Sequence, residues 1–139
     1  MKLETIDTSK LRIAGLLGET VEKTINKNIY KLNIDNDFIS PFKSKDCDIE
    51  YVGTGLLIES LARLSFMLKE VKLLRIKDKI INEIIKSQLD DGYIGALKKE
   101  NRVWGKWDIQ EVSYIIHGLL INYELFKHQQ SLEAAEKAG

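Results

Sequence analysis

The sequence predicts an all-α fold built from antiparallel helical hairpins, and three observations support this prediction. Long stretches repeat apolar residues three or four positions apart, which places them on one face of a helix. The alternation of apolar and polar residues that is typical of strands is absent. Pro41 is the only proline, and proline is the residue that helix interiors tolerate least. We therefore expect helices to dominate the chain.

Composition narrows the class of protein. The 139 residues, 44% of them hydrophobic, suffice to bury a core, and no Gly-, Ser- or Pro-rich linker divides them, so we expect residues 1–139 to form a single domain. The 21 basic and 21 acidic residues cancel, which argues against a nucleic-acid partner. No apolar run approaches the roughly 20 residues that cross a bilayer, and residues 1–10 contain no signal sequence. We expect a cytoplasmic protein without a membrane partner.

The first expected helix covers residues 19–31, where apolar side chains recur every four positions (Val21, Ile25 and Ile29). A turn is expected at residues 33–37, because Asn and Asp suit turns. The apolar residues on either side of Pro41 should hold this connection against the core (Phe38, Ile39 and Phe42). Residues 44–50 are polar and are expected to form a surface loop.

Two hairpins follow. Thr54 can cap a helix over residues 54–69, and a second helix over residues 73–89 stops at an Asp-Asp-Gly turn. After a loop rich in Gly and Lys, a helix over residues 107–126 directs its apolar side chains inward (Val112, Ile115, Ile116, Leu119, Leu120 and Tyr123). A final helix covers residues 132–138, with Ser131 as its cap.

The hairpins recur about every 50 residues, and each has an apolar face that a neighbour must cover. This pattern predicts part of a helical toroid, of which the (α/α)6 barrel is the commonest form. A twelve-helix barrel needs on the order of 200 residues, so we expect the chain to supply only part of one.

Three segments are more informative than the periodicity. They are Gln88-Leu89-Asp90-Asp91-Gly92-Tyr93-Ile94-Gly95, then Trp104-Gly105-Lys106-Trp107-Asp108-Ile109, and then Tyr114 followed by Gly118-Leu119-Leu120 and Tyr123-Glu124. In this order and spacing they resemble the β-L-arabinofuranosidase-like glycoside hydrolases of the family 127 type, which are (α/α)6 barrels. The resemblance spans roughly residues 21–139 and only the N-terminal portion of the family's domain.

The resemblance implies that Asp91, Tyr93, Trp107, Asp108 and Tyr114 lie near the mouth of the barrel and bind substrate. Aromatic rings suit sugar faces, and carboxylates accept hydrogen bonds from sugar hydroxyls. An alternative role is structural. Tyr93 and Trp107 would then pack as loop anchors, and Asp108 would serve only as the N-cap of its helix.

The chain departs from the family pattern at the start of the last motif helix. An ungapped comparison places Val112 where many members have a His. A register shifted by one would instead pair Glu111 and His117 with the family's Glu and His. We prefer the ungapped register and expect His117 to be a satisfied core residue.

The resemblance assigns no catalytic residue within this chain. The family's nucleophilic Cys, acid/base Glu and zinc-binding cysteines lie downstream of the matched motifs. Cys47 is the only cysteine, which excludes an internal disulfide, and a lone thiol is more often inert than catalytic. We predict no metal and no cofactor in this chain.

Two functions remain open. The first is the N-terminal part of a glycoside hydrolase that acts on arabinofuranoside-type or related plant-polysaccharide sugars and is inactive as this isolated chain. The second is a non-enzymatic helical-hairpin module for binding or interaction. For partners, we expect a carbohydrate ligand together with self-association or the remainder of a longer chain, because uncovered apolar helix faces favour association.

Overall fold

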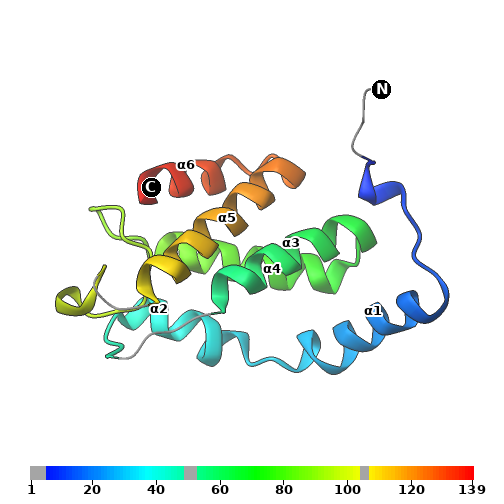
Figure 1. The fold of residues 1–139 in the computed structure, drawn as a ribbon, viewed down its shortest axis with the longest axis horizontal. Coiled ribbons are helices and arrows are strands. Elements are labelled where there is room, and N and C mark those ends of the chain that lie inside the picture. The colour runs from blue at the N-terminus through cyan, green and yellow to red at the C-terminus, as the bar shows by residue number, and fades with distance from the viewer. Residues whose placement is uncertain (1–5, 49–52, 104–106) are drawn as a thin grey trace.

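The computed structural model describes residues 6–48, 53–103 and 107–139. These ranges contain six α-helices, whose arrangement is drawn in Figure 1, and a sheet is absent from them. The helices are α1 (Gly15–Lys27), α2 (Ser40–Ser44), α3 (Thr54–Leu68), α4 (Val71–Lys86), α5 (Asp108–Phe126) and α6 (Gln129–Ala138). The predicted all-α fold class is confirmed.

The helices are arranged as the two expected hairpins. Helices α3 and α4 form the first and α5 and α6 the second, and α3 packs along α5 (Figure 1). Both hairpins turn on a lysine in the left-handed conformation, Lys69 with φ 55° and Lys127 with φ 57°. In Figure 1 the N-terminal segment with α1 and α2 lies on the opposite side of the α3–α4 hairpin from α6.

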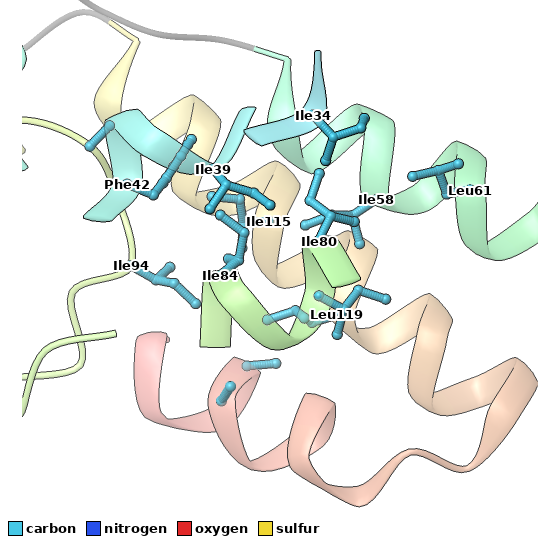
Figure 2. Close-up of a cluster of buried hydrophobic side chains, with 14 of the residues drawn as sticks. Ile34, Ile39, Phe42, Ile58, Leu61, Ile80, Ile84, Ile94, Ile115 and Leu119 are labelled. Atoms are coloured by element: carbon cyan, nitrogen blue, oxygen red, sulfur yellow. The ribbon is translucent and has the colours of Figure 1, made fainter. Parts of the chain in front are cut away.

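The core lies between α3, α4 and α5, as Figure 2 shows. Its fully buried side chains include Ile58 and Leu61 of α3, Ile80 and Ile84 of α4, and Ile115 of α5. Each such side chain stabilises the fold by about 1.5–3 kcal/mol relative to full exposure. The apolar residues around Pro41 join this core as predicted, since Ile39 and Phe42 are buried.

A glycine contact brings α3 and α5 close together. A Cβ atom at Gly55 would lie 2.3 Å from the carbonyl carbon of Tyr114, which is closer than any real Cβ contact. One at Gly118 would lie 2.9 Å from Cγ2 of Ile58. The two helices therefore approach at a distance that only glycine permits, and this brings the first turn of α3 against the middle of α5.

Several local predictions were wrong. The first helix covers Gly15–Lys27, followed by a separate 3-10 turn at Ile29–Lys31, and the expected turn at 33–37 is a π-helix, Ile34–Ile39. Thr54 was expected to cap α3, but the N-cap is Gly53, which has no side chain that could do so. Thr54 instead directs its hydroxyl to the carbonyl oxygen of Phe38, at 3.4 Å. Tertiary contacts override local propensity at these positions.

Two further predictions failed in the second hairpin. The last helix begins earlier than expected, at Gln129, so that Ser131 lies inside it and is buried against Asn122. Leu120 was expected to point inward but is 39% exposed. Among the described residues, no helix is both long and apolar enough to span a membrane.

Candidate functional site

A concavity of about 480 Å³ opens at the end of the molecule where the 88–103 loop meets the start of α5. Its polar lining includes Asp91, Tyr93, Arg102 and Asp108. Its apolar wall comes mainly from one face of α5 (Ile109, Val112 and Ile116). Three of the five residues predicted to bind substrate therefore lie around one hollow.

The turn at Asp91 and Gly92 is held in place by its neighbours. Gly92 has φ +91°, and a Cβ atom there would lie 2.1 Å from the carbonyl oxygen of Lys137 in α6. The side-chain amide of Gln88 donates to the carbonyl oxygens of Gly92 and Ala134, at 2.9 and 3.0 Å. Gly92 is therefore required both for its backbone conformation and for the close contact with α6.

Tyr93 and Asp108 form the central hydrogen bond of the site. The Tyr93 hydroxyl donates to Oδ1 of Asp108 at 2.8 Å and accepts from the backbone N–H of Leu97 at 3.0 Å. Burial, followed by the hydrogen bond to Asp108, raises the pKa of Tyr93 well above its usual value. The hydroxyl therefore stays protonated and keeps donating.

Asp108 ties the loop to the helix. It is 5% exposed, and its Oδ2 accepts from the backbone N–H of Val103 at 2.8 Å. The N-cap position of α5 belongs to Trp107, which makes no side-chain capping bond. The alternative that Asp108 serves only as an N-cap is therefore wrong.

Arg102 covers the Tyr93 ring. Its guanidinium carbon lies 4.0 Å from the ring centroid, and Nη1 lies 3.7 Å from Oδ2 of Asp91. A cation over an aromatic face is attracted by the ring electrons. The Tyr93 hydroxyl is thus hydrogen-bonded and its ring is in contact with Arg102, as expected for a residue that anchors a loop. Asp91 remains largely exposed at the rim of the concavity.

The other two candidate residues lie elsewhere. Trp107 is 46% exposed and does not line the concavity, and Tyr114 accepts a hydrogen bond from the side-chain amide of Gln110 at 2.9 Å. The first half of the Trp-Asp motif, residues 104–106, lies outside the described residues. The structure therefore brings together Asp91, Tyr93 and Asp108 but places Trp107 and Tyr114 off the hollow.

Glu111 has a role that sequence analysis left open. It is 2% exposed, and its carboxylate accepts from the backbone N–H groups of Gly53 and Gly55 at 2.8 and 2.9 Å. It thereby replaces the missing side-chain cap of α3. Burial raises the pKa of Glu111, and the backbone hydrogen bonds act in the opposite direction.

His117 was expected in the core, and this prediction was wrong. Its side chain is 52% exposed, with Nε2 3.4 Å from Oε1 of Glu59. Val112, the residue that the ungapped register places at the family's His position, does line the concavity.

The role of Glu111 had a signal in the sequence. Two glycines, Gly53 and Gly55, open α3 without a capping side chain, so their N–H groups need an acceptor from elsewhere.

Cys47 does not fit a zinc site of clustered cysteines. It is the only cysteine in the chain, and burial and the neighbouring Asp46 and Asp48 raise its thiol pKa. A metal-binding or nucleophilic cysteine needs the thiolate instead. Cys47 pairs its backbone with the 96–98 segment, accepting from Lys98 at 3.2 Å and donating to Ala96 at 3.3 Å.

Comparison with known proteins identifies a family. Residues 8–139 match the family described as beta-L-arabinofuranosidase, GH127 catalytic domain. No curated protein and no solved structure matches the chain. The matched range includes the whole concavity and all five candidate residues.

Proposed function

Since the chain belongs to the β-L-arabinofuranosidase family with the GH127 catalytic domain, whose fold is an (α/α)6 barrel, we propose that its concavity binds a saccharide of the arabinofuranoside type. The observation that carries this proposal is the convergence of Asp91, Tyr93 and Asp108 with the apolar face of α5 around one hollow. Sites for sugars combine apolar walls with a few oriented polar groups.

Each part of the hollow has a distinct task in this proposal. The wall of Ile109, Val112 and Ile116 packs against the C–H face of the sugar. The exposed Asp91 carboxylate accepts from sugar hydroxyls, and Arg102 donates to sugar oxygens. Tyr93 and Asp108 act as positioning residues, because their mutual bond and their bonds to Leu97 and Val103 hold the loop in shape.

The candidate residues supply binding and not bond cleavage in this proposal. Glycoside hydrolysis normally uses two carboxyl groups on either side of the scissile bond. Asp108 already uses both oxygens to hold the loop, and Glu111 holds the start of α3. With the thiol pKa of Cys47 raised, we expect the isolated chain to bind without hydrolysing.

An adjacent pair of aspartates offers a matched test of binding. Titration of the ¹⁵N-labelled chain with L-arabinose should shift backbone signals of residues 91–93 and 109–116. Asp91→Asn should weaken the response severalfold, since a neutral amide is a poorer acceptor for hydroxyls than a carboxylate. Asp90→Asn is the control, because Asp90 is exposed and does not line the hollow. Equal responses in both variants would contradict the proposal.

Trp107 and Tyr114 stay predictions from the resemblance. Trp107→Ala tests the first of them, because loss of the arabinose response in a folded chain would add the indole to the site. Turnover of a nitrophenyl arabinofuranoside by the purified chain, abolished by Cys47→Ala, would overturn the binding-only proposal.

A second candidate function, self-association, is favoured by the exposed leucines of α1. Leu16 is 77% exposed and Leu17 is 71% exposed. Covering such side chains with a second copy removes apolar surface from water. Light scattering should show a species larger than the monomer, and replacement of both leucines by Gln should restore the monomer mass. A monomer in the wild type would exclude this function.

A further inference from the structure

A second concavity of about 630 Å³ lies beside the first, lined by the C-terminal ends of α2 and α4 and by Arg102. Four cationic side chains and one carboxylate line it (Lys43, Lys45, Lys86, Arg102 and Glu83). The chain as a whole has a formal net charge of +0. Positive charge is thus concentrated in one hollow of a chain whose charges balance overall.

Two of these cations share a single carboxylate. Lys43 forms an ion pair with Glu83, and Nζ of Lys86 lies 2.9 Å from Oε1 of the same residue. Hydrogen bonds from the two lysines lower the pKa of Glu83 to about 2. One negative charge therefore serves two positive ones. Among the described residues Lys45 forms no ion pair, and Arg102 has the longer contact of 3.7 Å with Asp91.

Lys45 is held inside the hollow by its backbone and its neighbours. It ends α2 in the left-handed conformation with φ 49°, and its Nζ donates to the carbonyl oxygen of Gly95 at 2.9 Å. An ammonium has three donors, and within the described residues this is the one hydrogen bond that Lys45 Nζ makes. Its Nζ also lies 5.3 Å from the centroid of the Tyr93 ring. The donors that the bond to Gly95 does not use can turn to a ligand.

The ammonium of Lys45 stands in a cationic environment. Partial burial lowers its pKa to about 8, and the nearby Arg102 guanidinium is the second cause. Asp91 and Asp108 act in the opposite direction with smaller effect, and both line the first concavity instead. A bound anion would relieve the repulsion between Lys45 and Arg102.

Arg102 is already oriented for recognition. Its side chain is only 14% exposed, its Nε donates to the carbonyl oxygen of Leu97 at 3.3 Å, and its guanidinium lies over the Tyr93 ring. A guanidinium fixed in this way loses little further freedom when it pairs with an oxyanion.

We propose that this second concavity binds an oxyanion through Lys45 and Arg102, either the carboxylate of an acidic saccharide or a free tetrahedral oxyanion. Both ligands present oxygen atoms that share negative charge, which ammonium and guanidinium groups bind through charge-assisted hydrogen bonds. The inference does not require a neutral sugar in the first concavity, although Arg102 lines both hollows.

The test uses the full chain with sulfate, D-galacturonate and the neutral D-galactose as probes. Binding is followed by the side-chain NMR signals of Lys45 and Arg102. Lys45→Met should weaken oxyanion binding about tenfold, as expected for loss of a charged donor. Arg102→Lys should weaken D-galacturonate more than sulfate, because it keeps the charge and loses the planar fork.

Lys127→Met is the matched control for Lys45→Met. Lys127 also ends its helix in the left-handed conformation and stands over a tyrosine ring, with Nζ 5.7 Å from the Tyr123 centroid. It lines neither concavity. Lys127→Met removes a lysine charge from the same backbone conformation as at Lys45. The affinity for the oxyanions should stay within about twofold of the wild-type affinity, as expected for a remote surface charge.

A pH series separates Lys45 from the permanent charge of Arg102. Sulfate keeps its charge near neutral pH, so its affinity should fall as the pH rises through about 8 and Lys45 loses its proton. The Lys45→Met variant should lack this fall. The two lysines paired with Glu83 remain in both proteins and cancel from the comparison.

The outcomes divide clearly. Binding of D-galacturonate alone supports the site and identifies an acidic saccharide, and binding of sulfate alone supports it and identifies a free oxyanion. The proposal is overturned if neither probe binds, if D-galactose binds as tightly as D-galacturonate, or if both Met variants weaken binding equally. Failure of the sugar site is read separately, from the response of residues 109–116 to L-arabinose.

Discussion

The two ends of α5 both bury charged groups, but the groups differ in sign. In its first turn, Asp108 and Glu111 are 5% and 2% exposed, and both accept backbone N–H groups from other segments. Near its last turn, the ammonium of Lys77 from α4 lies 3.1 Å from Oδ1 of Asn122 and 3.9 Å from the centroid of the Phe126 ring. The signs match the helix macrodipole, which favours anions at the N-terminus and cations at the C-terminus.

The two ends also differ in what their buried groups hold. At the start of α5, Asp108 lines the open hollow and holds its loop, whereas Glu111 holds the start of α3. The Lys77 ammonium joins helices, because Asn122 in turn donates to the hydroxyl of Ser131 in α6 at 3.0 Å. Buried charge thus supports a candidate site and a helix start at the N-terminal end of α5, and helix packing at its C-terminal end.

Removing the Glu111 carboxylate should lower the stability of the fold the most. Glu111→Ala leaves the N–H groups of Gly53 and Gly55 without their acceptor, and the free energy of unfolding in urea should fall by about 3 kcal/mol. Glu124→Ala, an exposed change on the same helix, should cost less than about 0.5 kcal/mol. A loss at Glu111 as small as at Glu124 would show that the N-terminal end is not held by this carboxylate.

Removing the buried charge near the last turn of α5 should lower the stability less. Lys77→Met keeps the packed alkyl chain but removes the ion pair with Asp78 at 2.7 Å and leaves Oδ1 of Asn122 without its donor. We expect the free energy of unfolding to fall by about 1.5 kcal/mol in the same urea measurement. The control is Lys79→Met, whose ammonium is half exposed and pairs with Asp35 at the surface, with a change of less than about 0.5 kcal/mol. A more stable Lys77→Met variant would show that desolvation of the ammonium outweighs its hydrogen bonds.

The Tyr93 hydroxyl should contribute less to stability than either buried charge. Tyr93→Phe removes a hydroxyl that donates to Asp108 and accepts from Leu97, and should cost about 1 kcal/mol. The backbone amide signals of Leu97 and Val103 should shift with it. Tyr123→Phe is the control, with no shift expected at those two amides. Unchanged amides in Tyr93→Phe would mean that the loop keeps its shape without this hydroxyl.

Glu111 should also make the stability of the fold depend on pH. Because the pKa of Glu111 is raised in the fold, its contribution to stability is fully present below the unfolded value and declines as the pH rises through the folded value. The stability advantage of the wild type over Glu111→Gln should therefore shrink from pH 4 upward. Urea unfolding of both proteins across this range measures it, and an advantage that grows with pH would reverse the assigned sign.

Local pattern predicted the helices well and their ends less well. The apolar periodicity of α3, α4 and α5 reports which face is buried, and this information lies within each segment. The first turn of α1 escaped prediction because it contains Gly15 and Gly18, which are poor helix formers. His117 was misplaced for a different reason, since apolar neighbours in sequence do not guarantee burial of one side chain.

The sequence by itself determined the all-α class and the two hairpins, and the resemblance of its motifs to the family predicted Asp91, Tyr93 and Asp108 as residues of the candidate site. The motifs are visible in the sequence because the turn at Asp91 and Gly92 and the helix start at Asp108 are local events. Only the tertiary structure decided the partners of Glu111, which lie 58 and 56 residues away at Gly53 and Gly55, and the contact of Lys45 with Gly95, 50 residues away. Spacing within a segment is set by helix geometry, whereas such pairs depend on how α3 and α5 pack, and no periodic pattern in the sequence records that.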